Sequence, residues 1–178
     1  MEQSIGAGAA LAPVDPVHAV DAVLRDYAGR GVFSDYRMMA RKGNRDGAEY
    51  HFGWLYGQPF TLVCEPKQAR LSLPDLLPNI VRDSMLHKEV KAFLKGRAAA
   101  DVPEHRRVDP ARATAAARLR EGTVSLELTL CAATNTDELQ EDYAYGTRKL
   151  VNLAHELFLF MNEYWADYMW EHFQLNME

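Results

Sequence analysis

The sequence predicts one α+β domain, with an antiparallel β-meander sheet of about four to five strands, helices packed on one face and a long C-terminal helix. Three patterns predict it: strand-like runs joined by short turns in residues 36–64, a cleanly alternating run in residues 123–131, and an apolar helical pattern in residues 138–173. Short turns force antiparallel neighbours, because a parallel return needs about a dozen residues or more. We expect the domain to cover residues 15–178, after a flexible tail of residues 1–14.

The composition is that of an ordinary globular protein. With 178 residues, 48% hydrophobic and 25% charged, the chain fits one domain and needs no disulfide or metal to fold. Cys64 and Cys131 both fall in strand-like runs, so we expect two buried cysteines in a reducing compartment. Residues 1–14 lack the basic start of a signal peptide, and no apolar run is long enough to span a membrane. We therefore expect a cytoplasmic, bacterial-type soluble domain without membrane contact.

Charge is unevenly spread along the chain, whose formal net charge is −5. Residues 81–120 hold ten Lys or Arg against five Asp or Glu, whereas residues 133–178 hold two against nine. This asymmetry indicates either two binding faces or two segments that lie against each other and neutralise one another. We favour the second interpretation.

The first helix is expected to begin at Asp15-Pro16, where an acceptor side chain precedes a proline at the first helical position. Apolar residues then recur at helical spacing as far as Tyr27. Gly29 and Gly31 can end the helix, because glycine readily adopts the left-handed conformation that follows many helices.

The meander is predicted by alternation and by turn residues. Glycine-rich turns at residues 43–47 and 57–59 separate three runs, and Tyr50, Phe52, Trp54 and Tyr56 share one face of the middle run. We interpret this aromatic row as the core that receives the helices. Leu71 and Leu73 extend the meander, and residues 74–78, with a proline at each end, are expected to break regular structure.

The second half of the chain begins with two predicted helices. Ser84 is a plausible cap for a helix that ends at Gly96 or in the alanines after it. Asp109-Pro110 repeats the cap and first-position pair, so the alanine-rich residues 111–119 are predicted to form a short helix. Gly122 then lets the chain turn into the alternating strand.

The last helix is unusually apolar. Residues 138–173 carry adjacent apolar stripes and only a narrow polar one, so the helix must be covered on more than one side. We expect Asn135 and Glu138 to form a capping box at its start, and any interruption to fall at Gly146. The sheet covers one side, and other helices or a second copy of the chain must cover the rest. The residues expected at such a partner interface are Leu153, Phe160, Tyr164, Trp165 and Tyr168.

The densest polar cluster lies just before the predicted alanine-rich helix. Arginine forks match phosphate or carboxylate groups, and a helix start adds its dipole, so the cluster is the best candidate for an anion site. The alternative, which we favour, is an exposed loop whose arginines pair with the acidic final helix. The candidate ligand-binding residues are His105, Arg106, Arg107 and Asp109, with His155 and Glu156 as partners across a cleft.

Searches for established motifs exclude several functions. The zinc-protease pattern needs two histidines four residues apart on one helix, and no such pair, CxxC motif or glycine-rich phosphate loop occurs. We therefore expect no metal and no cofactor, and assign no catalytic residue. The aromatic row of residues 50–56 loosely resembles a base-stacking platform, but an acidic chain lacks the basic footprint that phosphates require, so we expect no nucleic-acid partner.

The order helix, three-strand meander, helix, strand, long helix resembles the type III secretion chaperone-like fold. The resemblance covers residues 15–175 and rests on Asp15-Pro16, the two turns of the meander, the strand 123–131 and the apolar last helix. It implies helices on one face of a twisted antiparallel sheet, and dimerisation. The sequence departs from that pattern in two places, with one strand instead of two before the last helix and an extra segment at residues 101–120.

Two functions are compatible with these features. The first is a non-enzymatic protein-binding domain, chaperone-like or adaptor in type, that acts as a homodimer and engages another protein through an apolar face. The second is a small enzyme or anion-binding protein that uses His105, Arg106 and Arg107. Convergence of those side chains around a concave pocket would favour the second.

Overall fold

The structure of this protein is a computed structural model that describes residues 15–41, 47–131 and 136–174. Six antiparallel strands form one sheet in the order β1-β2-β3-β4-β6-β5. The elements are α1 (Pro16–Gly29), β1 (Ser34–Ala40), β2 (Ala48–Trp54), β3 (Gln58–Glu65), the 3-10 turn η1 (Pro66–Gln68), β4 (Arg70–Leu77), α2 (Met85–Gly96), β5 (Ala113–Arg120), β6 (Thr123–Leu130), α3 (Thr136–Tyr164) and α4 (Ala166–Phe173).

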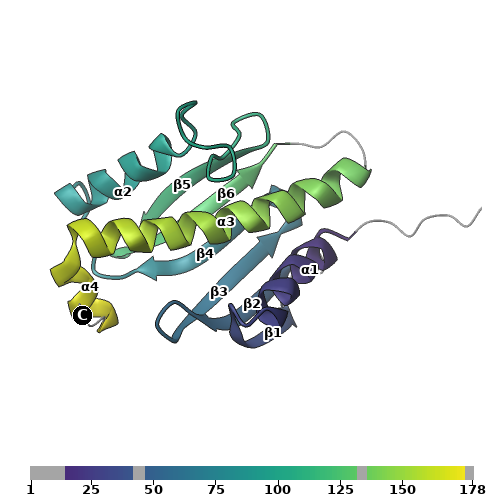
Figure 1. Ribbon diagram of the computed structural model, residues 1–178, viewed down its shortest axis with the longest axis horizontal. Coiled ribbons are helices and arrows are strands. Elements are labelled where there is room, and N and C mark those ends of the chain that lie inside the picture. Colours follow the sequence, from purple (N-terminus) through teal and green to yellow (C-terminus); the bar gives the residue numbers. More distant parts are fainter. Residues whose placement is uncertain (1–14, 42–46, 132–135, 175–178) are drawn as a thin grey trace, which may run out of the picture.

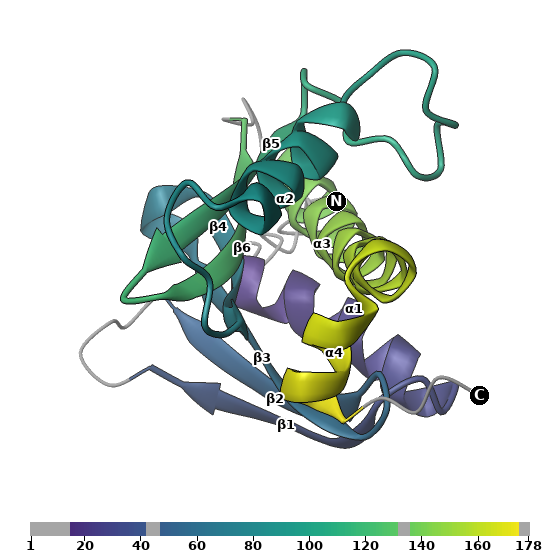
Figure 2. The same ribbon diagram turned by 90° about the vertical axis from the view of Figure 1, so that its left-hand side faces the viewer.

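The helices all lie on one face of the sheet, as predicted. Helix α3 crosses the strands diagonally, with α2 on one side of it and α1 on the other (Figure 1). A view turned by 90° places these three helices on the same side of the strands (Figure 2). The α+β class, the antiparallel meander and the long C-terminal helix are confirmed, with six strands in place of about four to five.

The core lies between the helices and the inward-facing side chains of the strands. In β2, Ala48, Tyr50, Phe52 and Trp54 are buried and alternate with partly exposed residues. The aromatic row is therefore core, as predicted, apart from Tyr56, which lies in the following turn and is 61% exposed. The row also meets helix α1 through a polar contact, since the Tyr50 hydroxyl donates to the Val17 carbonyl at 2.8 Å.

Two helices begin where the sequence predicts. The Asp15 carboxylate accepts from the Val17 N–H at 2.9 Å and caps α1. The Ser84 hydroxyl accepts from the His87 N–H at 3.2 Å and caps α2, which ends at Gly96. Side chains at these caps satisfy N–H groups that have no partner within the helix.

The alanine-rich segment is a strand, so the helix predicted for residues 111–119 is wrong. All eight residues of β5 pair with β6, and Glu121 and Gly122, both with positive φ, close the turn between them. Alanine favours helices locally, but the ladder with β6 and the packing of α2 outweigh that preference. The structure therefore has two strands before the last helix, where the sequence predicted one.

The prolines at positions 74 and 78 predicted that regular structure would break at Pro74, but strand β4 does not end there. It continues to Leu77, but its register with β6 shifts between Leu73 and Leu77. Asp75 lies in this bulge with φ of 52°, and its N–H donates to the Ser125 hydroxyl at 3.1 Å. Proline cannot donate to a ladder, so the bulge absorbs it without ending the strand.

The last helix is interrupted at Trp165 and not at Gly146. Helix α3 runs through Gly146 without a break, because the missing side chain lets it lie close to the sheet: a Cβ there would stand 2.7 Å from Leu130. Trp165 leaves the helical conformation at φ −133° and donates from its indole N–H to Glu89 on α2 at 2.7 Å. The predicted cap Asn135 lies outside the described residues.

Cys64 is buried, as predicted, but Cys131 is exposed, because it takes the outward position that follows buried Leu130 in the alternation of β6. Most of the turn predicted at residues 43–47 lies outside the described residues. Within the described part of the chain, no helix combines the length and apolar character needed to cross a membrane.

Candidate functional site

The two oppositely charged segments lie against each other. Glu156 on α3 has an 11% exposed side chain and accepts from Arg97 and from Arg106, each at 2.6 Å. Arg112 pairs with Asp142 on the same helix at 2.8 Å. These pairs agree with the interpretation of the charge pattern as mutual neutralisation.

The remaining loop residues of the predicted anion site surround a hollow of about 640 Å³. His105, Arg107 and Asp109 line it, together with Arg112, Tyr145, Arg148 and Lys149. The Lys149 ammonium donates to the carbonyls of Glu104 and His105, and burial lowers its pKa from the ordinary value. The hollow is therefore lined by four cationic side chains in addition to His105.

His155 lies apart from this cluster. Its ring packs 6.2 Å from the ring of Trp54 on β2, on the side of α3 away from Arg106. Adjacent helical residues point about 100° apart, so Glu156 reaches the loop arginines and His155 does not. The structure thus brings Arg106 to Glu156 but does not bring His155 to either.

The predicted partner-interface residues divide into buried and exposed members. Leu153 is 1% exposed and lies in the core of the protomer. Tyr168 and Trp165 are held by hydrogen bonds within the chain, Tyr168 by donation to the Pro78 carbonyl at 2.6 Å. Tyr164 is 63% exposed and its ring packs 5.0 Å from that of Phe160. Tyr164 is therefore the exposed member of this pair, and Phe160 is partly buried.

The free edge of β5 is a second candidate surface. The Cys131 N–H donates to the Arg112 carbonyl, so the backbone groups of Arg112 face β6. Backbone groups alternate in direction along a strand, so the N–H and C=O groups of Ala116 also face β6. The intervening residues Ala115 and Ala117 point their N–H and C=O groups away from β6. No other strand pairs with this edge in the described part of the chain.

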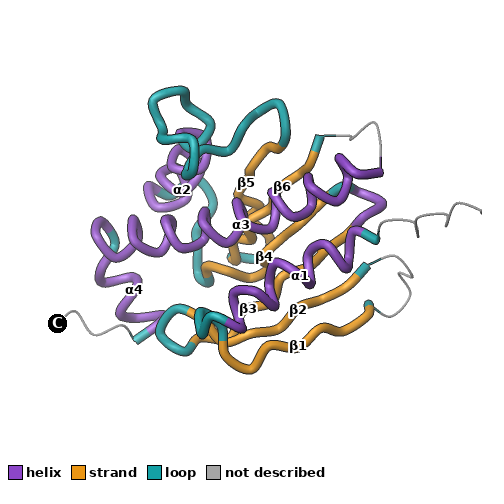
Figure 3. Tube along the Cα trace, turned by 45° about the vertical axis from the view of Figure 1, so that its right-hand side comes forward, coloured by secondary structure: helices purple, strands orange, loops and turns teal. Residues whose placement is uncertain are grey.

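An apolar groove of about 400 Å³ runs between this edge and α2. Lys91 and Lys95, one helical turn apart on α2, stand at its border, and neither makes an ion pair with any described residue. The loop from α2 to β5 lies beside the same edge (Figure 3). The other residues that line the groove are Ala92, Leu94, Ala98, Val108, Pro110 and residues 113–117.

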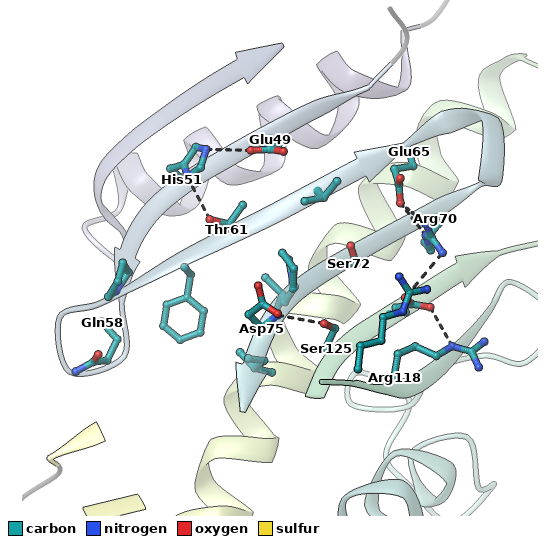
Figure 4. Close-up of a pocket in the computed structure, with 18 of the residues that line it drawn as sticks. Glu49, His51, Gln58, Thr61, Glu65, Arg70, Ser72, Asp75, Arg118 and Ser125 are labelled. Atoms are coloured by element: carbon teal, nitrogen blue, oxygen red, sulfur yellow. Dashed lines mark hydrogen bonds and ion pairs between the residues drawn. The ribbon is translucent and has the colours of Figure 1, made fainter. Parts of the chain in front are cut away.

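A third feature is a cleft of about 670 Å³ on the face of the sheet that carries no helices. The ladder between β3 and β4 contains only the pairs from Glu65–Arg70 to Val63–Ser72, after which the two strands separate (Figure 4). Pro59 and Pro74 line the cleft on either side of the separation. Neither can donate to a ladder, which accounts for the early end of the pairing.

Charged side chains of alternating sign cross the open face beside this cleft. Glu65 pairs with Arg41 and with Arg70, at 2.9 and 2.6 Å. Glu127 continues the row, pairing with Arg70 at 3.8 Å and with Arg118 at 3.1 Å. Glu49 pairs with Arg41 at 3.3 Å, so the row contains three acids and three arginines. These pairs stabilise the sheet and leave the row without excess charge.

Neither the groove nor the cleft was identified from the sequence. Proline within a strand-like run, at Pro74, was a usable signal, because it demotes that position in a ladder. The alternation of the strands was a second signal. It places Glu65, Arg70 and Glu127 on the same outward face of the sheet, where they can form ion pairs. The groove depended on recognising β5 as a strand.

Comparisons with known proteins return nothing: no protein-family model, no curated protein and no solved structure matches this chain.

Proposed function

We propose that this chain is a non-enzymatic protein-binding domain, chaperone-like or adaptor in type, that binds an extended segment of another polypeptide along the free edge of β5. The single observation that carries the proposal is an unpaired, regular strand edge beside an apolar groove. A peptide added to such an edge gains backbone hydrogen bonds, and pockets beside the edge select its side chains.

The groove also indicates the chemistry of the partner. Its floor is built largely of alanines, which leave room for the apolar side chains of an incoming strand. Lys91 and Lys95 lack acidic partners among the described residues, and like charges one turn apart destabilise a helix slightly. Acidic residues in the partner would relieve this repulsion. An extended segment that alternates apolar and acidic residues therefore fits best.

A short peptide of alternating valine and glutamate tests the proposal by fluorescence anisotropy, with a valine–lysine peptide as the reference. Ala117→Pro removes an outward N–H and should abolish binding of the acidic peptide. Lys91→Glu combined with Lys95→Glu should weaken it roughly tenfold, because the border then repels the peptide. Lys88→Glu is the matched control: Lys88 is exposed on the same helix but does not line the groove.

Two results would contradict strand addition. One is equal binding of the acidic and basic peptides by the unmodified chain. The other is unchanged binding of the acidic peptide by Ala117→Pro, with circular dichroism confirming that the variant is folded.

A homodimer is the proposed assembly state of this binding domain. It is supported by an aromatic cluster at the end of α3, where exposed Tyr164 packs on Phe160 and Phe160 packs on Phe93 of α2, each with a ring spacing of 5.0 Å. Phe160 and Phe93 are partly buried. Aromatic residues at a surface are typical of protein contacts. Sedimentation velocity at micromolar concentration should show a dimer that Tyr164→Glu dissociates, whereas a monomer of the unmodified chain would refute the assembly.

Anion binding is the second candidate function, favoured by the four cationic side chains that line the hollow around Tyr145. Inorganic phosphate should then raise the melting temperature of the unmodified chain. Arg107→Gln should remove that increase and Lys88→Gln should leave it. A melting temperature that does not respond to millimolar phosphate would exclude this function.

A further inference from the structure

The cleft between β3 and β4 is suited to a small molecule more than to an inserted strand. Strand insertion needs N–H donors on both walls, but Pro59 and Pro74 supply none and the Asp75 N–H is already bound to Ser125. Side chains must therefore make the contacts. The volume of about 670 Å³ falls in the range of small-molecule sites, roughly 300–1,000 Å³.

The inner end of the cleft is apolar and aromatic. Phe60 and Phe158 meet there with ring centroids 5.8 Å apart, and Phe173 of α4 packs 5.2 Å from Phe158. Leu73 and Leu76 of β4 complete this floor. Aromatic and aliphatic groups leave water favourably for such a surface, so it would receive the apolar part of a ligand.

The rim of the cleft contains one charge of each sign that has no ion-pair partner among the described residues. Six of the acidic and arginine side chains that line it are ion-paired with one another: Arg41, Glu49, Glu65, Arg70, Arg118 and Glu127. Asp75 and Arg120 are the other two, and neither makes an ion pair with any described residue.

These two free charges lie at the same end of the cleft. The Asp75 backbone is fixed to Ser125 of β6, and Figure 4 shows its side chain in the gap where β3 and β4 separate. Arg120 of β5 pairs in register with Thr123, two residues before Ser125 on β6. A ligand with a single charge would satisfy one of them and leave the other unpaired, whereas a zwitterion complements both.

We propose that this cleft binds a free α-amino acid with a large apolar side chain. Asp75 receives its ammonium group, Arg120 receives its carboxylate, and the side chain lies against Phe60, Phe158 and Phe173. The site is separate from the free edge of β5 and does not depend on strand addition there.

Isothermal titration calorimetry with L-phenylalanine and L-leucine tests the proposal without any variant. Phenethylamine and 3-phenylpropionate each lack one of the two charges and should bind roughly tenfold more weakly than phenylalanine. Glycine, which has no apolar side chain, should give no measurable heat. Absence of heat with both amino acids, or equal affinity for phenylalanine and either single-charge analogue, would overturn the proposal.

Three variants assign the contacts. Asp75→Asn should weaken phenylalanine binding roughly tenfold and leave 3-phenylpropionate unaffected, and Arg120→Gln should weaken it equally and leave phenethylamine unaffected. Arg37→Gln is the control, since Arg37 is an exposed arginine on β1 that does not line the cleft, and should retain the affinity. Full binding by both test variants, each confirmed as folded, would overturn the assignment. Because no peptide is present, these results are independent of strand addition at β5.

Discussion

Strands β1 and β5 form the two edges of the sheet, and they differ in how each meets its single neighbour. The ladder of β1 with β2 shifts register between Ser34 and Arg37, and Asp35 there has a φ of 51°. The ladder of β5 with β6 is regular over eight residues. Bulges and charges protect an edge from pairing with another chain. The comparison shows that the edge strand β1 is irregular at its start, whereas the edge strand β5 is regular along its whole length.

The largest expected effect is on the free energy of unfolding. It should separate a proline that replaces an N–H facing β6 from a proline that replaces an outward N–H of β5. Ala116→Pro removes an N–H that faces β6 and should lower the free energy of unfolding by about 3 kcal/mol. Ala117→Pro removes an outward N–H and should lower it by about 1 kcal/mol, mainly through backbone strain. Urea unfolding followed by circular dichroism measures both. Equal effects would show that the β5 edge is not open as described.

The irregular edge strand β1 is joined to helix α1 by a hydrogen bond. The Tyr36 hydroxyl donates to Asp21 at 2.6 Å, so Tyr36→Phe should lower the free energy of unfolding by about 2 kcal/mol and speed hydrogen exchange in β1. Tyr27→Phe is the control, because the Tyr27 hydroxyl bonds to no described residue, and should stay within about 0.5 kcal/mol. Unchanged exchange in β1 would mean that this hydrogen bond does not hold the edge strand.

Alkaline pH should reduce the contribution that Tyr36 makes to the free energy of unfolding. Burial, and then hydrogen bonding to Asp21, raise the pKa of Tyr36 above its ordinary value of 10.0. Above that pH the unfolded chain loses the phenol proton and the folded chain keeps it, so the stabilisation present at lower pH declines as pH rises. Between pH 9 and 11, Tyr36→Phe should reduce this decline by about 1 kcal/mol. An identical pH profile for both chains would contradict the assignment.

The smallest effect is expected on the exposed side of β1. Met39 is 53% exposed, so Met39→Lys should change the free energy of unfolding by less than about 0.5 kcal/mol. It should also leave binding of the acidic peptide at β5 unchanged. A measurable loss of peptide binding would indicate that β1 and not β5 is the docking edge.

Local patterns in the sequence predicted much of this fold. The caps at Asp15 and Ser84 and the alternation in β2 and β6 are decided by neighbours in the chain, and these elements form as expected. The break of the last helix was misplaced, because the position of Trp165 is set by Glu89 of another helix. Gly146 was read as a helix breaker, although it serves to bring α3 close to the sheet.

The candidate sites were harder to predict, because they depend on which strands adjoin. The pairing of Arg106 with Glu156 follows from opposite charge and was anticipated as one alternative. The cleft arises where β3 and β4 separate after three pairs. Pro74 indicated a weak position in a ladder, but not which strand would be its neighbour. The sequence cannot distinguish Asp75 and Arg120 from the other charged residues of the cleft, because the ion pairs of those residues are known only from the structure.

Strand β5 has one consequence for how this protein is synthesised. Its alanines favour a helix until β6 is present to pair with them. On the ribosome, residues 111–119 leave the exit tunnel before β6 and would first populate helical turns. An isolated peptide of these residues should give a helical circular dichroism signal in trifluoroethanol, and the segment should convert to a strand only when β6 has emerged.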